Sequence, residues 1–347
     1  MKKKCTIYDV AKIAGVSPST VSRVMNTPEM VAEDTRQKVA NAVKELAYIP
    51  NMMAVNMPKR RTNYIGLIIP DITNIFFSNL VRGVQDVCEK HGYSVLVVNS
   101  DDSQKKEGRY LKLLYSRRVD GVILTVAGYR EEEFPEEELS LLKKMNIVLI
   151  DREINGMMAP IVKVNNFGGA YSAVEYLLTM GHRKIMYLAG IERTKTNQER
   201  EKGYLSALKE ARINWKKELT ADFRLDTAYQ KIIVYWPQLQ NSGDLPTAIF
   251  AANDLMAIGA LKALAQLKIR VPEDISIIGF DDIPFSDCTY PPLTTIAQPT
   301  YLMGQKAVET LLKLIDKKKI KKSKKSIELE TELIQRDSVR RLENKDK

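Results

Sequence analysis

The sequence predicts an α/β protein with a small helical head and two lobes that each contain a doubly wound parallel sheet. Two observations lead to this fold class. Residues 6–48 hold three helical patterns, with apolar residues three and four positions apart. From residue 63 onward, apolar runs without polar alternation recur between helical patterns, which is typical of parallel strands buried on both faces. A chain of 347 residues has room for two or three domains of this kind.

Residues 6–26, which read TIYDVAKIAGVSPSTVSRVMN, predict two short helices joined by a tight turn. Gly15 can adopt a positive φ and end the first helix. Ser17 is a suitable N-cap for the second helix, because Pro18 follows it at the first helical position. The positions expected to face a small core are Val10, Ala11, Ala14, Val21 and Val24.

The second of these helices has the composition of a helix that reads DNA. Its free positions hold small hydroxyl side chains and one arginine, which reach base edges and phosphates in a major groove without steric conflict. We therefore expect a helix-turn-helix, although spacing alone leaves a generic three-helix cap open. The residues expected to face DNA from this helix are Pro18, Ser19, Thr20, Ser22, Arg23 and Asn26.

A third helix is expected over residues 33–48, with Val39, Val43 and Leu46 toward the same core. Charge supports a polyanion as partner of this region, because residues 1–61 hold 11 Lys/Arg against 5 Asp/Glu. A second basic run lies at residues 317–325, where a solvated loop is the simplest interpretation.

Other classes of site and protein are not expected. Cys5, Cys88 and Cys288 are far apart and form no CxxC pair, so neither a disulfide framework nor a metal site is expected. The sequence has no glycine-rich phosphate loop and no nucleophile elbow, so it predicts neither an enzyme nor a cofactor. The start MKKKCTIYDV lacks the apolar core of a signal peptide, and no apolar run is long enough to span a membrane, so we expect a cytoplasmic protein.

Three motifs in order, YDVAKIAGVS, STVSRVMN and VKELAYIPN, resemble the N-terminal module of the LacI/GalR family of bacterial transcription regulators. The resemblance implies a homodimer on a near-palindromic operator in double-stranded DNA, with Thr6, Tyr8 and Ser17 among the contacts. It also implies that residues 51–62 form a hinge helix on DNA. There Asn51 and Ala54 would contact DNA, and Met57 occupies the position of the apolar wedge in the minor groove.

The rest of the chain resembles the family's effector domain and the periplasmic sugar-binding proteins. The apolar runs at 64–69, 94–98, 121–124 and 147–150 form one set, and those at 161–164, 184–189, 248–250 and 275–278 form a second. The expected domains are a DNA-binding domain at 1–50, the hinge at 51–62, an effector and dimerisation domain at 63–340 and a tail at 341–347. Its lobes would comprise about 63–161 with 293–322, and about 162–292 with 323–340.

Polar and aromatic residues follow several predicted strands, where open α/β sheets bind ligands. Carboxylates and amides bond to hydroxyls, arginine donates paired bonds, and aromatic faces cover the C–H side of a sugar ring. The set resembles the pocket of ribose-binding proteins, which implies a small sugar as ligand. The residues implied are Asn74, Phe76, Phe77, Asp151, Arg152, Arg200, Phe223, Asn253, Asp281 and Gln298.

Each of these groups also has a structural interpretation. Asn253 suits a helix N-cap, Arg200 alone is an ordinary helix arginine, and Asp151 with Arg152 can form a surface ion pair. Because all of them gather around one predicted cleft, the binding interpretation is favoured. We expect a repressor that a ribose-like aldose releases from DNA, with co-repression equally compatible. A regulator answering to a phosphorylated carrier protein and a sugar-transport protein are the alternatives.

Overall fold

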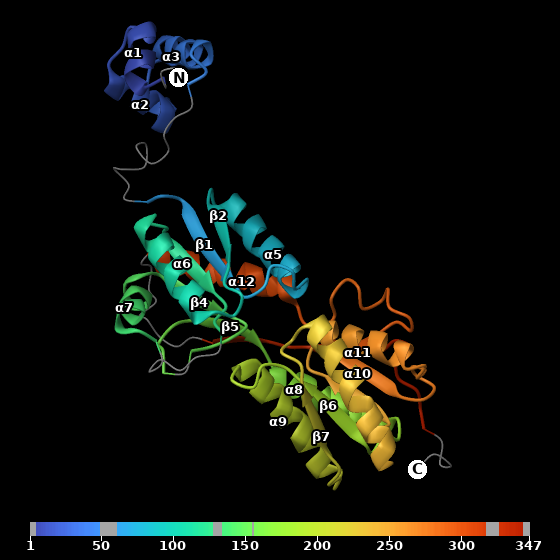
Figure 1. Ribbon diagram of the computed structural model, residues 1–347. Coiled ribbons are helices and arrows are strands. Elements are labelled where there is room, and N and C mark those ends of the chain that lie inside the picture. Colours follow the sequence, from blue (N-terminus) through green and yellow to red (C-terminus); the bar gives the residue numbers. More distant parts are fainter. Residues whose placement is uncertain (1–4, 49–60, 128–133, 155, 317–325, 343–347) are drawn as a thin grey trace. The chain divides into compact units, whose positions relative to one another are not determined.

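The protein is described by a computed structural model covering residues 5–48, 61–127, 134–154, 156–316 and 326–342 (Figure 1). The chain divides into two compact units, Met1–Asn63 and Tyr64–Lys347. Most of the expected hinge, the lysine run at 317–325 and most of the expected tail lie outside the described residues.

The first unit is the predicted three-helix head. Its elements are α1 (Ile7–Ala14), α2 (Pro18–Asn26), a short 3-10 turn η1 (Pro28–Met30) and α3 (Glu33–Glu45). Gly15 ends α1 with a φ of 65°. Helix α3 ends before the expected residue 48, because Ala47 adopts a positive φ and the Tyr48 N–H returns to the Val43 carbonyl at 3.0 Å. The buried core consists of Val10, Ala11, Ala14, Val21, Val39 and Ala42.

The second unit begins with a six-stranded sheet in the order β11-β5-β4-β3-β1-β2. Its strands are β1 (Tyr64–Ile69), β2 (Ser94–Asn99), β3 (Gly121–Leu124), β4 (Ile147–Ile150), β5 (Ile161–Val164) and β11 (Ser326–Leu329). All neighbours pair in parallel. Strands β1, β3, β4 and β5 are buried almost throughout, as the sequence predicts, whereas the edge strand β2 is only partly buried.

Helices cover both faces of this first sheet (Figure 1). One face packs against α5 (Phe76–Lys90) and α12 (Thr300–Ile315), and the other against α6 (Gln104–Ser116) and α7 (Glu136–Lys144). Along β1, Leu67 belongs to the first of these cores and Ile68 to the second. The α5 and α12 backbones approach closely at Gly83, where an added Cβ would lie 2.2 Å from the Tyr301 carbonyl oxygen.

A second six-stranded sheet has the order β12-β10-β9-β8-β6-β7. Its strands are β6 (Ile185–Ala189), β7 (Lys217–Thr220), β8 (Ala248–Ala251), β9 (Ser276–Asp281), β10 (Thr294–Ala297) and β12 (Glu332–Ile334). Only β12 pairs in the antiparallel sense. The covering helices are α8 (Asn166–Thr179), α9 (Lys195–Glu210), α10 (Leu225–Ser242) and α11 (Asp254–Gln266). The fold class is thus confirmed as a helical head plus two doubly wound lobes.

The chain crosses between the two sheets a few residues later than expected. Strand β5 belongs to the first sheet and β10 to the second, and β11 returns to the first. The expected boundaries near residues 162, 293 and 323 therefore assigned β5, β10 and β11 to the wrong lobes. The sheet to which a strand belongs depends on the strand with which it pairs. The apolar residues of a strand do not specify that partner.

His182 connects the second lobe to the segment that follows β12. Its ring is fully buried, with Nδ1 3.0 Å from the Thr247 hydroxyl and Nε2 3.1 Å from the Arg340 carbonyl oxygen. Burial lowers the pKa of His182 from 6.5 to about 4. The neutral ring is therefore part of the folded structure.

Membrane-spanning helices and disulfides are two features that the sequence does not predict. No helix among the described residues combines the length and the apolar character needed to cross a membrane. The three cysteines are free thiols, and burial raises the pKa of Cys88 to about 12.

The depressed pKa of His182 predicts acid sensitivity. The unfolded chain binds this proton more tightly than the folded protein does. The fold therefore keeps its full free energy of unfolding above pH 6.5 and loses part of it as pH falls from 6.5 toward about 4. The shift corresponds to about 3 kcal/mol. Urea unfolding of the full chain against His182→Gln between pH 7.5 and 4 measures it. The free-energy gap between the two proteins should shrink on acidification, and a constant gap would contradict the assignment.

Candidate DNA-reading head and interlobe pocket

The start of α2 holds a cluster of hydroxyl groups. The Thr20 N–H donates to Ser17 Oγ at 3.1 Å, which makes Ser17 the N-cap. The hydroxyls of Ser19 and Thr20 lie 2.7 and 2.8 Å from the same oxygen. These groups sit at the positive end of a helix that contains no acidic residue in its first turn. This end of α2 is suited to phosphate oxygens.

The side chains expected to face DNA differ in their exposure. Ser19 and Arg23 are exposed, Pro18 and Ser22 are half-buried, and Tyr8 on α1 is 71% exposed. The Thr6 N–H and hydroxyl both bond to the Asp9 carboxylate, at 2.8 and 2.7 Å, so Thr6 also caps α1. Asn26 is the last residue of α2. Asn51, Ala54 and Met57 lie outside the described residues.

The second unit contains a small cavity of about 30 Å3 between its lobes. Asn74, Phe76 and Phe77 reach it from the start of α5, Asp151 and Arg152 from the end of β4, and the remaining residues from the second lobe. Nine of the ten residues predicted for a sugar site line this cavity. The lining residues are Asn74, Phe76, Phe77, Asp151, Arg152, Thr196, Arg200, Phe223, Asn253 and Asp281.

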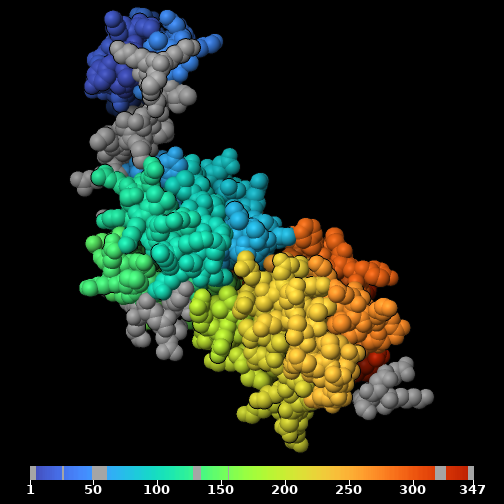
Figure 2. Space-filling view, viewed as in Figure 1, coloured from blue at the N-terminus to red at the C-terminus, as the bar shows by residue number. Residues whose placement is uncertain are grey.

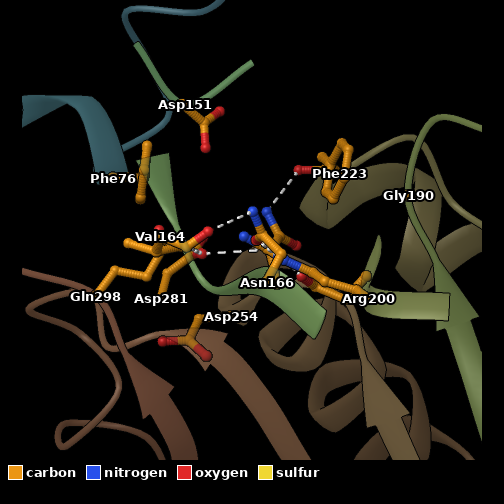
Figure 3. Close-up of polar contacts among 12 residues, drawn as sticks. Phe76, Asp151, Val164, Asn166, Gly190, Arg200, Phe223, Asp254, Asp281 and Gln298 are labelled. Carbon is orange, nitrogen blue, oxygen red and sulfur yellow. Dashed lines mark hydrogen bonds and ion pairs between the residues drawn. The ribbon is translucent and has the colours of Figure 1, made fainter. Parts of the chain in front are cut away.

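Arg200 on α9 is the buried centre of the second lobe's half of this pocket (Figure 3). It is 3% exposed. Its Nε donates to Asn166 Oδ1 at 2.9 Å, and its Nη1 donates to the Ala252 carbonyl oxygen. Its Nη1 also lies 3.6 Å from Asp281 Oδ1, and its guanidinium stacks over Phe280 at 3.7 Å from the ring centroid. The arginine is therefore fixed in place before any ligand arrives.

Arg152 is the buried arginine in the first lobe's half of the pocket. Its Nη1 donates to the Asp102 carboxylate and to the Val126 carbonyl oxygen, the latter at 3.2 Å. Its Nε lies 3.7 Å from Asp151 Oδ2. Its guanidinium also stands 5.8 Å from the centroid of the Phe223 ring, which comes from the other lobe. Arg152 thus contacts both walls of the cleft.

The two pocket carboxylates are shifted toward their neutral forms. Burial raises the pKa of Asp281 well above its ordinary value, although Arg200 acts in the opposite direction. Burial likewise raises the pKa of Asp151, and Arg152 and Arg200 oppose that rise. A carboxyl group accepts hydrogen bonds in either protonation state and donates one when it is protonated, so these two groups suit hydroxyl ligands, which both donate and accept.

Gln298, the tenth predicted residue, lies behind the pocket rather than in its wall. Its Nε2 donates to Asp281 Oδ1 at 2.7 Å and so orients that carboxylate (Figure 3). Asn253 has the double role expected of it, since its Oδ1 caps α11 and its Nδ2 donates to the Phe223 carbonyl oxygen at 3.2 Å. Asp254 bonds to Ser286, Thr295 and the Ile283 N–H, and burial raises its pKa to about 6.

Thr196 was not identified from the sequence, yet it lines the pocket. It lies in the first turn of α9, and the rule that ligands bind after β-strands would have found it if applied to residues 190–197. Its buried hydroxyl has no hydrogen-bond partner, and the same is true of Arg152 Nε and Gln298 Oε1. Buried polar atoms are normally satisfied, so Thr196 and Arg152, which line the pocket, mark places for ligand or water oxygens.

The backbone is strained around the same cleft. Asp151, Phe223 and Asp281 adopt φ values of 65°, 61° and 121°, which non-glycine residues rarely do. Such residues cost energy individually and concentrate at ligand sites. The arrangement can accommodate hydroxyl groups chemically, and no group of three potential metal ligands occurs in the described parts of the chain.

Both units of the chain are similar to known proteins. Residues 6–51 match the family described as bacterial regulatory proteins, lacI family, and residues 174–339 match a periplasmic binding protein-like domain. The HTH-type transcriptional repressor PurR of Vibrio vulnificus is 37% identical over 341 residues, which cover 97% of this chain and 99% of that protein.

Solved structures show the same likeness. The lac repressor dimer bound to operator and the anti-inducer ONPF has a TM-score of 0.85 and 30% identity, covering 97% of this chain and all of that one. A LacI family regulator from Enterococcus faecium with bound ribose has a TM-score of 0.71 and 30% identity, covering 81% of this chain and all of that one.

The contacts of Arg200 predict a large loss of stability when it is replaced. Arg200→Met leaves the Asp281 carboxylate buried without its cation, which should lower the free energy of unfolding by about 3–5 kcal/mol. Arg224→Ala is the matched control, because that side chain is 67% exposed and should change stability by about 0.5 kcal/mol or less. Urea unfolding of both variants measures the difference, and similar losses for the two would contradict the role of Arg200.

Proposed function

Because this chain belongs to the lacI family of bacterial regulatory proteins and is a DNA-binding transcriptional regulator rather than an enzyme, we propose that it represses genes for sugar use. A small, ribose-like aldose between the two lobes modulates this repression. We further propose that it works in the cytoplasm as a homodimer on a near-palindromic operator. Each head contributes one α2 to a half-site, and half-sites related by the dimer axis give the operator its symmetry.

The composition of the interlobe pocket is the main support for a sugar. Two buried arginines, two carboxylates with raised pKa and two amides converge there beside three phenylalanine rings. Hydroxyls satisfy such mixed donors and acceptors, and the rings suit the C–H face of a sugar. The ribose-bound regulator from Enterococcus faecium is a relative with the same fold, and its ligand is consistent with this proposal.

On DNA, Ser19 and Arg23 would contact bases and phosphates from the exposed face of α2. Met57 of the hinge would insert into the minor groove at the operator centre. A ligand can change DNA affinity only by preferring one arrangement of the lobes. We propose that sugar favours an arrangement in which the hinges separate, so that the repressor leaves the operator.

The first test of this proposal is a thermal-shift panel of aldoses, sugar phosphates and sugar acids on the full chain. A true ligand at 100 times its Kd should stabilise the fold by about 2.7 kcal/mol. D-Ribose or a close analogue should give such a shift, and Arg152→Ala should abolish it. Asp226→Asn, at an exposed residue outside the pocket, is the control. If no member of the panel stabilises the protein, the proposed ligand class is wrong.

The second test concerns the link between pocket and DNA. A head cut before Asn51 should bind operator weakly and ignore sugar, because it lacks the hinge and the partner subunit. Gel shifts of the full chain and the cut head, with and without sugar, measure this. Tighter operator binding with sugar would replace the inducer assignment by co-repression. Equal affinity of the cut head and the full chain would exclude a role for the hinge.

A further inference from the structure

Helix α6 carries a buried acid, Glu107, on the face that packs against the first sheet. Helices α6 and α7 lie side by side on the first lobe, and their outer faces form the turquoise and green surface in Figure 2. Glu107 lies in the first turn of α6 and is 1% exposed. Both of its carboxyl oxygens are buried, and neither makes a hydrogen bond of normal geometry. Buried polar atoms normally have such partners, so Glu107 is an exception that needs a physical reason.

The charged groups that the structure places around Glu107 are one arginine and two acids. They are Arg152 after β4, Asp102 in the turn before α6, and Glu138 on α7. Arg152 and the Ala127 N–H after β3 favour the ionised form of Glu107, and the two acids oppose it. Strand β1 also packs on α6, but with apolar residues. Among the described residues, one cation therefore has to serve more than one carboxylate.

Arg152 pairs with only one of these acids in the structure. Its Nη1 donates to the Asp102 carboxylate, whereas its Nε is buried and has no hydrogen-bond partner. An unbonded guanidinium N–H inside a protein is costly, just as the unbonded oxygens of Glu107 are. Arg152 thus has an unused donor, and Glu107 beside it has unused acceptors.

The protonation state of Glu107 accounts for this arrangement. Burial raises the pKa of Glu107 to about 8, although Arg152 acts in the opposite direction. A protonated Glu107 carries no charge and leaves Arg152 to Asp102. An ionised Glu107 needs the cation more than Asp102 does, because Asp102 is 25% exposed and can be hydrated whereas Glu107 cannot. Ionisation therefore favours an exchange of partners by Arg152.

We propose that Glu107 is a positioning residue whose proton decides which carboxylate Arg152 binds. While Glu107 holds its proton, Arg152 bonds to Asp102. When the proton passes to water, the Nε–H of Arg152 turns to the Glu107 carboxylate. The Arg152 guanidinium stands 5.8 Å from the centroid of the Phe223 ring in the second lobe, so a turn toward α6 weakens a contact between the lobes. An effect on DNA binding rests on the proposed function, whereas the exchange of partners does not.

Nuclear magnetic resonance of the full chain between about pH 6 and 9.5 tests the exchange. The two probes are the carboxyl carbon of Glu107 and the Nε–H group of Arg152, which is identified by its absence from Arg152→Lys. Both signals should shift with one midpoint near pH 8, because ionisation of the acid moves the arginine. This shared midpoint is measured on the unmodified chain, so it does not depend on how well any variant folds.

Two substitutions make the test specific. Glu107→Gln should keep the Arg152 signal fixed over the whole range, because glutamine has the size of the protonated acid and cannot ionise. Glu138→Gln is the matched control, since Glu138 is also a buried acid whose pKa burial raises, on the adjoining helix. In that variant the Arg152 signal should still titrate, with a slightly lower midpoint because a repelling acid has been removed.

Stability gives a second measurement of the same proton. The folded chain binds it more tightly than the unfolded chain, in which the carboxyl has its ordinary pKa of 4.5. This stabilisation is complete below pH 4.5 and is lost as pH rises to about 8. The melting temperature of the full chain should therefore fall relative to that of Glu107→Gln over this interval. His182 titrates in both proteins, so its contribution cancels from the difference.

Three outcomes would overturn the proposal. An Arg152 signal that stays fixed while Glu107 titrates would leave Glu107 without control over the arginine. A Glu107 midpoint below about pH 6 would mean that the acid is already an anion near neutral pH. An Arg152 titration that persists in Glu107→Gln would assign the proton to another group. None of these measurements uses a sugar or DNA, so the exchange and the proposed sugar response succeed or fail separately.

Discussion

One buried cation, Arg200, determines how the second lobe presents its side of the cleft. A guanidinium removed from water must be surrounded by acceptors. Its partners come from three segments far apart in the chain: Asn166 at the start of α8, the Ala252 carbonyl after β8, and Asp281 at the end of β9. All three lie at carboxyl ends of the sheet or at the helix starts beside them. The pocket therefore depends on several segments along the edge of the sheet and not on one segment alone.

The ion pairs between the two lobes are individually weak, and Ile283 of the second lobe also packs into the core around α5 and α12. Lys163 on β5 of the first lobe lies 3.4 Å from Glu199 on α9 of the second. Arg224 Nη2 of the second lobe lies 3.8 Å from Asp71 Oδ2 of the first. Partly exposed ion pairs of this kind contribute about 0–1 kcal/mol each. A ligand that bonds to both lobes can outweigh such contacts, which is the physical requirement for a switch.

Much of the fold and the site followed from the sequence, because the rules involved are local. Parallel strands buried on both faces read as apolar runs, and residues after those runs converge at one edge, which is why Phe76 and Asp281 were correctly placed together. Thr196 was missed because its position depends on the first turn of a helix. The expected points at which the chain crosses between lobes were wrong because β5 and β10 have the same apolar composition as neighbouring strands. Only the pairing of strands assigns them to a sheet.

The strands β11 and β12 each close an edge of a different sheet, and Leu342 beyond them bonds back to the Met180 carbonyl at 2.8 Å. During translation, neither lobe can be finished until the ribosome has released these residues. The head, encoded first, can fold far earlier as a separate unit. A nascent chain therefore passes through a stage in which the head is folded while the two sheets of the second unit still have unpaired edges exposed.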